Sequence, residues 1–427
     1  MTQTDSRPQS KSAERSLTRP EWSLLLVLAA LQFVNIVDFM LVMPLGPQLM
    51  RVFHIGTPEF NTIVSAYTFS ASIAGLLAAL GVDRFDRKSA LMTFFVGFIA
   101  GNVFCALAPT YPALVAARIV TGAFGGLIGS MVFAVVADAV PEVRRGIAMG
   151  IVAAAFSVAS VAGVPLGVHF GTKYGWHVPF FAIAAMSTVV LLLGWRALPP
   201  MREHLKHPRE HTPLMRLWLT LNDPTHLKAF SLSALMMLSS FLIIPSISPY
   251  LVANVGLTEE QLPLIYIVGG AMSLLSTPLV GRLSDRFGRQ IVFAATAVFS
   301  VGAIAVLTNL PRGPLWYGVG GVALFIIGNS ARMTASMALI SSTIEPHRRG
   351  GFMTVNTCVQ HLTAGIAAWL SAHIVRGGNG AAMEHYNVVG AISLAVTLVS
   401  IAAAWMLRPI ASAAPAIEGD AMAEGAG

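Results

Sequence analysis

Long apolar runs recur along the whole chain and strongly restrict the folds that the chain can adopt. A helix that crosses about 30 Å of hydrocarbon at ~1.5 Å per residue needs about 20 mostly apolar residues. Twelve runs of at least this length occur, and they predict twelve membrane-spanning helices in two groups of six. The runs cover residues 22–49, 61–82, 89–108, 112–137, 147–171, 176–197, 228–252, 261–283, 290–309, 315–341, 352–375 and 386–407.

The composition indicates a protein whose main solvent is lipid. Charged residues make up 11% of the chain and hydrophobic residues 55%, whereas soluble domains contain about 25% charged residues. The first run begins at Trp22, is too long for a signal-peptide core and lacks a cleavage site, so we expect it to remain as a span. The expected fold is all-α, with two six-helix bundles related by pseudo-symmetry.

Polar segments divide the chain into five parts. The proline-rich stretch between the two groups of runs reads as a linker. We expect a cytoplasmic N-terminal tail, an N-terminal bundle, this linker, a C-terminal bundle and a disordered C-terminal tail. Their boundaries are 1–20, 21–197, 198–227, 228–408 and 409–427.

The basic residues predict how the chain is oriented, because Lys and Arg accumulate in short cytoplasmic loops. With the N-terminus inside, 21 of the 27 Lys and Arg residues fall in cytoplasmic segments, 4 in external loops and 2 within spans. The net charge of +7 is therefore assigned to membrane loops, and no basic stretch interleaved with aromatics indicates a nucleic-acid partner. We expect a multi-pass protein in the lipid bilayer of a bacterial inner membrane, with both termini cytoplasmic.

Two short motifs recur at matching places in the two groups of runs. Asp83–Arg87 follows the second run, and the similar Asp285–Arg289 follows the eighth, 202 residues later. Arg144–Gly146 follows the fourth run, and Arg348–Gly350 follows the tenth, 204 residues later. Similar offsets at matching places indicate a duplicated half. Two duplicated halves around a cavity are the architecture of alternating-access transporters.

Two further motifs carry a family resemblance. The loop Gly281–Gln290 resembles the loop signature GxLaDRxGRK of the major facilitator superfamily, and its first copy, Ala79–Lys88, departs from it at Ala79 and Asp86. Both positions are glycine in the family pattern. Leu114–Gly122 resembles the intramembrane arginine motif LxxxRxxxG of the same family. The resemblance extends over nearly the whole chain, from the first run to the last.

The fifth run resembles one branch of that superfamily. Gly163–Gly167, followed by Gly175-Trp176, is similar to the drug:proton antiporters and their arabinose efflux permease relatives, with the usual GPxxGG compressed to GxPxG. The resemblance implies a secondary transporter, not an enzyme, that exports small organic compounds such as drugs, sugars or metabolites. The residues themselves predict that Gly163, Pro165 and Gly167 bend this helix and allow close packing.

Asp38 is the one acidic residue that lies deep in a run. A charge at mid-membrane costs several kcal/mol, so it persists only when it is paired, neutralised or in contact with water. Arg118 is the natural partner, because the two residues lie at similar depths, about 15 Å and about 10 Å of helix from the external ends of their spans. A carboxylate that changes its partner can bind and release a proton. We interpret the pair as a proton-coupling device; a structural ion pair is the alternative.

Other polar residues in the runs are candidates for substrate contact. Gln32 and Asn35 share a helical face with Asp38, with interhelical hydrogen bonding as the alternative role. Arg332 has no acidic residue at its depth, so we expect it to face water, carbonyl groups or an anionic ligand. The charges of Asp38, Arg118 and Arg332 sum to a positive value, which favours neutral or weakly anionic substrates. The cavity candidates are Gln32, Asn35, Asn329, Arg332, Asn356, Gln360 and His361.

The repeated loop motifs are interpreted as a cytoplasmic gate. Their arginines are placed to hold helix ends of the opposite bundle, and their aspartates to pair with arginines or to cap a helix. A solvated positive loop, the alternative, explains the arginines but not the aspartates. The resemblance implies in addition that Asp83, Arg87 and Asp138 lock the outward-facing state. The gating candidates are Asp83, Arg84, Arg87, Asp138, Gly281, Asp285, Arg286, Gly288 and Arg289.

The energy source is inferred from motifs that the sequence lacks. Because no nucleotide loop of the GxxxxGKS or GxxxxGKT type occurs, we expect no cofactor and transport driven by the proton gradient. The linker histidines His204, His207 and His211 are interrupted by Pro208, so we expect no metal site. We expect a monomer whose partners are protons and a small-molecule substrate. Proton-symport uptake or facilitated diffusion stays an alternative, as does a transport-inactive membrane assembly factor or sensor.

Overall fold

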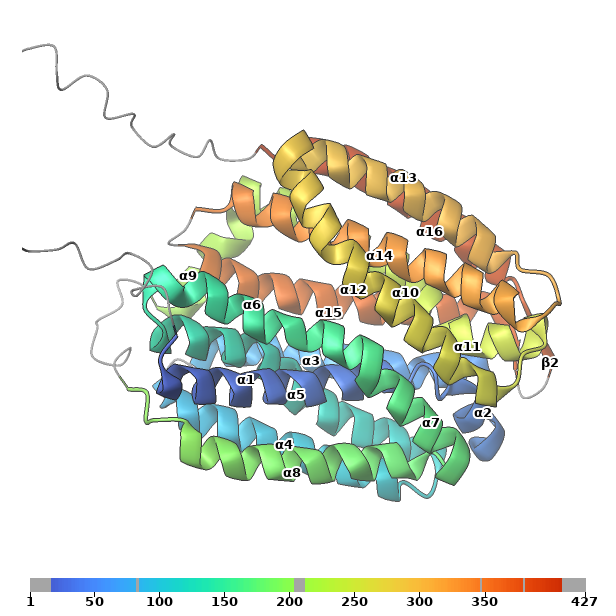
Figure 1. The fold of residues 1–427 in the computed structure, drawn as a ribbon, viewed down its shortest axis with the longest axis horizontal. Helices are drawn as coiled ribbons and strands as arrows, with labels where there is room; N and C mark the ends of the chain where they lie inside the picture. Colours follow the sequence, from blue (N-terminus) through green and yellow to red (C-terminus); the bar gives the residue numbers. More distant parts are fainter. Residues whose placement is uncertain (1–16, 82–83, 203–211, 346–347, 379–380, 409–427) are drawn as a thin grey trace, which may run out of the picture.

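The structure is a computed structural model in which long helices run side by side (Figure 1). It confirms the expected all-α membrane architecture, with one short hairpin that the sequence analysis did not predict. The linker histidines, Asp83 and the C-terminal tail lie outside the described residues. The structure describes residues 17–81, 84–202, 212–345, 348–378 and 381–408.

The N-terminal part of the fold contains six spans, and two of them depart from a straight α-helix. The α-helix of the first span ends at Leu41 and resumes at Gly46, and the fifth span contains a π-helical turn, η3. Both departures lie next to prolines, which cannot donate a backbone hydrogen bond. The elements are α1 (Arg19–Leu41), α2 (Gly46–Phe53), α3 (Thr57–Gly81), α4 (Arg87–Leu107), α5 (Tyr111–Ala139), α6 (Glu142–Val158), η3 (Ala159–Gly163), α7 (Val164–Tyr174) and α8 (His177–Ala197).

The C-terminal part repeats this plan after a linker helix, α9. Its first span is broken into short helical turns near Pro245 and Pro249. The elements are α9 (Pro213–Asn222), α10 (Pro224–Ile243), η5 (Ile244–Ser246), α11 (Ile247–Tyr250), η6 (Leu251–Val255), η7 (Glu259–Gln261), α12 (Leu262–Phe287), α13 (Arg289–Thr308), α14 (Leu315–Thr343), α15 (Arg349–Ile374), the antiparallel strands β1 (Arg376–Gly378) and β2 (Ala381–Glu384), and α16 (Tyr386–Trp405).

Eleven helical segments among the described residues are long and apolar enough to cross a membrane. The twelfth expected span corresponds to α15, which is 26 residues long but less apolar than the others. Its polar residues lower its hydropathy, yet it packs against both α3 and α10. Polar side chains inside a membrane bundle are typical of functional or interhelical contacts.

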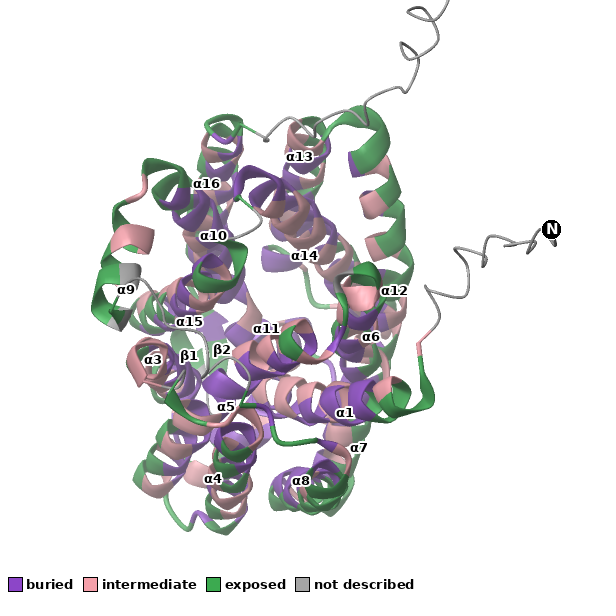
Figure 2. Ribbon diagram, turned by 90° about the vertical axis from the view of Figure 1, so that its left-hand side faces the viewer, coloured by how far each residue is buried: buried purple, intermediate pink, exposed green. Residues whose placement is uncertain are grey.

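The molecule has two distinct ends. α1 begins and α16 ends at the end that carries α9, whereas α2 and the hairpin lie at the opposite end (Figure 1). We call these the α9 end and the α2 end. Seen from the α9 end, the N-terminal and C-terminal bundles form two halves, which meet mainly where α3 packs on α15 and where α12 packs on η3 and α7 (Figure 2).

Glycines in the fifth span let it pack tightly on α1. A Cβ added at Gly163 would lie 2.3 Å from Val37 Cγ2, and one added at Gly167 would lie 2.6 Å from Leu41 Cδ1. Real Cβ atoms do not approach so closely, so only glycine fits at these positions. This packing fixes the segment of α1 that carries Asp38 against its neighbour.

Candidate functional site

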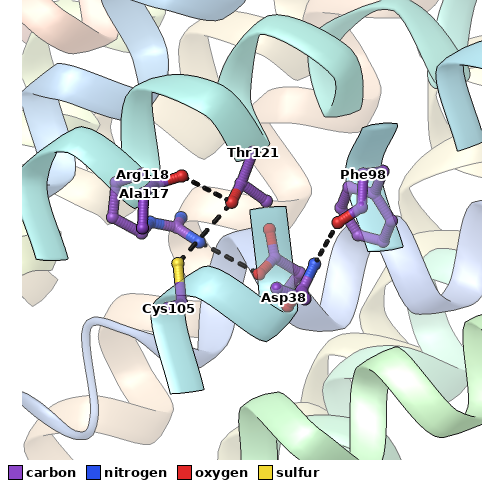
Figure 3. A network of polar contacts seen from close by, with 7 residues as sticks. Asp38, Phe98, Cys105, Ala117, Arg118 and Thr121 are labelled. Atoms are coloured by element: carbon purple, nitrogen blue, oxygen red, sulfur yellow. Dashed lines mark hydrogen bonds and ion pairs between the residues drawn. The ribbon is translucent and has the colours of Figure 1, made fainter. Parts of the chain in front are cut away.

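Asp38 of α1 and Arg118 of α5 meet inside the N-terminal bundle (Figure 3). Arg118 Nη1 donates a hydrogen bond of 3.0 Å to Asp38 Oδ1. The side chains are 0% and 1% exposed, so water does not screen their attraction. The structure therefore brings together the two residues that the sequence analysis matched by depth.

The pair leaves two of its own polar atoms unsatisfied. Asp38 Oδ2 and Arg118 Nε are buried and have no hydrogen-bond partner among the described residues. Tyr67 of α3 lies with its ring centroid 4.3 Å from Arg118 Cζ, which is a cation–π contact. On α4, Cys105 Sγ lies 3.6 Å from Thr121 Oγ1, beside the guanidinium (Figure 3). The free carboxylate oxygen is an atom that can accept a proton.

Gln32 and Asn35 lie on α1 next to the glycines of α5. A Cβ added at Gly125 would lie 3.0 Å from Asn35 Oδ1, and one added at Gly129 would lie 3.7 Å from Gln32 Nε2. Gln32 Oε1 and Asn35 Oδ1 have no hydrogen-bond partner among the described residues. These two acceptors are therefore available to a ligand or to water.

Arg332 is buried among neutral oxygen atoms, and no acidic residue pairs with it among the described contacts. Its Nη1 donates to Ser239 Oγ at 3.1 Å and to Thr397 Oγ1 at 2.7 Å. Its Nη2 donates to Ser240 Oγ at 3.2 Å and to Asn329 Oδ1 at 3.4 Å. From the sequence, Arg332 was expected to face water, carbonyl groups or an anion, and the hydroxyl partners were not expected. Serine and threonine are common in spans, so they give no signal until their neighbours are known.

The polar residues of α15 face two different neighbours. Phe352 stacks on a phenylalanine ring of α10, with centroids 4.8 Å apart. Asn356 is one turn further along and is buried, and Gln360 follows one turn later, so both share that face. His361 instead contacts Phe39 of α1, with ring centroids 6.0 Å apart. The structure thus places His361 against the opposite bundle.

The two bundles are joined at the α2 end by polar contacts that the sequence analysis missed. Arg51 of α2 pairs with Glu259 of η7, and its Nη2 donates to Glu259 Oε2 at 3.1 Å. This hydrogen bond to the carboxylate raises the pKa of Arg51. Thr57 Oγ1 donates to the carbonyl of Gly377 at 2.9 Å. The partners are 208 and 320 residues apart in sequence, so only the folded chain shows them.

A cavity of about 140 Å³ opens to solvent at the α9 end. Its lining comes from α3, α4, α5, α9 and α15, so both bundles and the linker helix contribute. Among the described lining residues Arg87 is the one with a charge, and the uncharged polar ones are Ser130, Thr220 and Thr354. The molecule is therefore open at the α9 end and held together at the α2 end.

The described gating candidates lie at the α9 end around this opening. Arg87 Nε donates to Asp138 Oδ2 at 3.1 Å within the N-terminal bundle. Arg84 and Asp285 are exposed, as is Arg286, which lies over the ring of its neighbour Phe287. In this conformation, the described contacts of the loop arginines therefore include one ion pair, Arg87–Asp138, that lies within the N-terminal bundle. Bonds to the opposite bundle from these arginines stay a prediction.

The two copies of the loop differ where one has aspartate and the other glycine. Gly288 adopts φ +93°, which favours glycine, whereas Asp86 adopts φ −56°. Asp86 Oδ1 instead accepts a hydrogen bond of 2.7 Å from the backbone N–H of Met201, at the start of the linker. A Cβ at Gly281 or at Gly288 would meet no atom within 4 Å, and Arg289 is half-buried.

Fold and site together define an all-helical membrane transporter built from two related bundles. A family model described as the Major Facilitator Superfamily matches the chain twice, over residues 28–232 and 229–423. The chain belongs to this superfamily of secondary transporters, which are not enzymes. The two matches correspond to the two bundles.

Relatives and solved structures agree with this assignment. The chain is 27% identical over 261 residues to an uncharacterized MFS-type transporter, YceJ, of Bacillus subtilis (strain 168). That match covers 61% of this chain and 66% of the relative. A bacterial homolog of the human lysosomal transporter Spinster, inward-facing and unoccupied, is similar in fold, with TM-score 0.73, 14% identity and coverage of 92% and 97%. A D-xylose-proton symporter gives TM-score 0.72, 16% identity and coverage of 91% and 98%.

Proposed function

We propose that the protein is a proton-coupled exporter of small organic compounds, of the drug:proton antiporter branch, in a bacterial inner membrane. The observation that carries the proposal is the buried Asp38–Arg118 pair with a free carboxylate oxygen. A proton bound to Asp38 neutralises it and releases Arg118, whereas loss of the proton restores the pair. One carboxylate can therefore link proton binding to a change of contacts between α1 and α5.

The proton gradient is sufficient for this task. One proton that moves down about 100 mV and one pH unit releases roughly 3.7 kcal/mol. At 1.4 kcal/mol per tenfold change, this energy supports about a 400-fold gradient of a neutral solute. A single titrating carboxylate in the membrane is therefore enough for active transport.

The α9 end is assigned to the cytoplasm. Arg84, Arg87 and Arg286 lie at this end, in keeping with the accumulation of basic residues in cytoplasmic loops. The open cavity then faces inward and the Arg51–Glu259 end faces outward. A reporter enzyme fused after Arg408 should report cytoplasm, and one inserted near Thr57 should report the outside; the reverse result contradicts this orientation.

The substrate is inferred to be neutral or weakly anionic. Arg87 is the charged residue of the described cavity lining and is paired with Asp138, and the other described lining residues are uncharged, so the lining offers no unpaired carboxylate to a cation. Arg332 adds a second buried cation that no acidic residue neutralises among the described contacts. An organic dication would enter this field without an acidic partner, whereas an anion or a neutral compound avoids that repulsion.

The test begins with a susceptibility screen of cells with and without the protein, which identifies exported compounds. Inverted membrane vesicles with an acidic lumen and a pH-sensitive dye then show whether such a compound releases protons. Wild-type vesicles should do so, and Asp38→Asn vesicles should not, because asparagine forms hydrogen bonds but does not titrate. Glu260→Gln, which changes an exposed carboxylate at the α2 end, is the matched control.

Two outcomes would refute the proposal. Active accumulation by Asp38→Asn that collapses with an uncoupler would make Asp38 a structural residue. Solute movement in the same direction as the proton would indicate symport instead of export.

A further inference from the structure

Four aromatic rings connect the buried ion pair to the opposite bundle. Phe39 follows Asp38 on α1, and its ring centroid lies 5.4 Å from that of Tyr67 on α3. The same Phe39 ring lies 5.8 Å from Phe241 of α10 and 6.0 Å from His361 of α15. The rings therefore meet where the two bundles touch, and two of them come from each bundle.

Tyr67 contacts both the buried ion pair and Phe39. It lies 4.3 Å from the guanidinium carbon of Arg118, and it also touches Phe39. Tyr67 is 2% exposed, so neighbouring atoms hold it on all sides. Movement of Phe39 therefore shifts the Tyr67 ring, which the Arg118 guanidinium contacts.

Phe39 is supported by the C-terminal bundle only while the bundles are close. In the present conformation, open at the α9 end, Phe241 and His361 pack on it. Rocking of one bundle against the other, as alternating access requires, removes this support and lets Phe39 and Tyr67 shift. The contacts that hold Arg118 against Asp38 then differ between the two conformations.

We propose that Phe39 and Tyr67 are positioning residues that transmit the separation of the bundles to the Asp38–Arg118 pair. The inference rests on the proposed proton coupling. It identifies the side chains that connect the Asp38–Arg118 pair to the interface between the bundles. His361 acts in this route as a ring that packs on Phe39, not as a proton carrier.

The groups that face the Asp38 carboxylate are few. Arg118 comes from α5, Tyr67 from α3 and Cys105 from α4, and the packing of α6, α7 and α8 on α1 brings no further charged group to it among the described residues. The proton affinity of Asp38 is therefore set mainly by Arg118 and by what holds Arg118 in place. If this affinity differs about tenfold between the two conformations, pH must change their population ratio about tenfold, because such coupling is reciprocal.

Spin-label distances measure this ratio without a known substrate. Labels at Val143→Cys on α6 and Phe287→Cys on α12 flank the α9 end, where both side chains are exposed. Both native cysteines are buried and are kept, since Cys105 lies beside the ion pair, and the protein is held in lipid nanodiscs between pH 5 and pH 9. We expect the ratio of open to closed distances to change about tenfold with pH in the otherwise wild-type protein, and not at all in Asp38→Asn.

Ring substitutions then test the route. Tyr67→Leu and Phe39→Leu should reduce the pH-driven change to about threefold or less, since a buried cation–π contact or its support is lost. Tyr67→Phe keeps the ring and should behave as wild type. From the opposite bundle, His361→Leu should reduce the change, whereas His361→Phe should preserve it.

The outcomes separate the two proposals. A full tenfold response in both Tyr67→Leu and Phe39→Leu, with none in Asp38→Asn, overturns the ring route and leaves proton coupling intact. A wild-type response in Asp38→Asn overturns proton coupling and the route together. Loss of the response in Tyr67→Phe or in His361→Phe also overturns the route, because the ring would not be the acting part.

Discussion

Arg51 of α2 and Glu259 of η7 form an ion pair that joins the two bundles at the α2 end. Arg51 is 63% exposed and Glu259 is 16% exposed, so the pair is partly screened by water. The nearby hydrogen bond from Thr57 to Gly377 also crosses between the bundles. These contacts hold shut the end of the molecule that lies opposite the open cavity, and a conformational change must break them.

Removal of this ion pair should favour opening at the α2 end. Glu259→Gln or Arg51→Ala is expected to raise the population open at this end about two- to fivefold, because a partly exposed pair contributes about 0.5–1 kcal/mol. Maleimide labelling of a cysteine placed at Ile55, which is buried at this end in the present conformation, measures this opening. The exchanged pair Arg51→Glu with Glu259→Arg should restore the wild-type rate; unchanged labelling in both single variants would show that the pair holds nothing shut.

Two glycines of the fifth span should respond in opposite ways to alanine. Gly163→Ala places a Cβ 2.3 Å from Val37 Cγ2 and should lower stability by about 1–3 kcal/mol. Gly150→Ala in α6 meets no atom within 4 Å and should raise stability by about 0.5–1 kcal/mol through the better helix propensity of alanine. Thermal unfolding in detergent compares the two; equal melting temperatures would refute the packing argument.

The fold was predictable because each span must satisfy the same physical demand. About 20 apolar residues are needed to cross the membrane, so the spans are visible one at a time. The hairpin of β1 and β2 was missed, since it is only a few residues long and lies between two spans. The break after Leu41 was missed as well, because the apolar run continues through it to Leu49.

The site was predictable only where one residue limited the choice of its partner. Asp38 is an acidic residue deep in a span, so a cation at the same depth was required, and Arg118 was available. Glu259 gave no such signal, because a charge near a helix start at a membrane surface has many acceptable partners. The rings of Phe39 and Tyr67 resemble any other apolar residues until the bundles are packed together.

Arg332 should prove unimportant for stability when its volume is kept. Without Arg332, the hydroxyls of Ser239 and Thr397 still bond to each other at 2.6 Å, so little is left unsatisfied. Arg332→Met should therefore change stability by about 1 kcal/mol or less, in keeping with other replacements of buried charges by apolar residues. Arg332→Ala leaves a cavity and should cost about 2–4 kcal/mol. A large loss of melting temperature in Arg332→Met would identify Arg332 as a structural residue instead.

The ionised Asp86 carboxylate should contribute to the free energy of unfolding at neutral pH, and this contribution should be lost in acid. Burial alone would raise the pKa of this carboxyl, but hydrogen bonds from the Met201 backbone and from Ser89 outweigh burial and lower it below its usual value of 3.8. A lowered folded-state pKa means that the stabilisation is complete above the unfolded-state pKa and is lost as the pH falls through the folded-state pKa.

Asp86→Gly, which introduces the residue found at the matching position Gly288, tests this contribution of the carboxylate to stability. It should lower the free energy of unfolding by about 1 kcal/mol at pH 7, the typical contribution of such hydrogen bonds. The difference from wild type should shrink below about pH 4 and vanish once Asp86 is protonated in the folded protein. Asp285→Asn, a change of an exposed carboxylate in the second loop copy, should have little effect on stability at any pH. A loss in Asp86→Gly that stays the same from pH 7 to pH 3 would show that backbone conformation at position 86, and not the carboxylate, holds the linker to the loop.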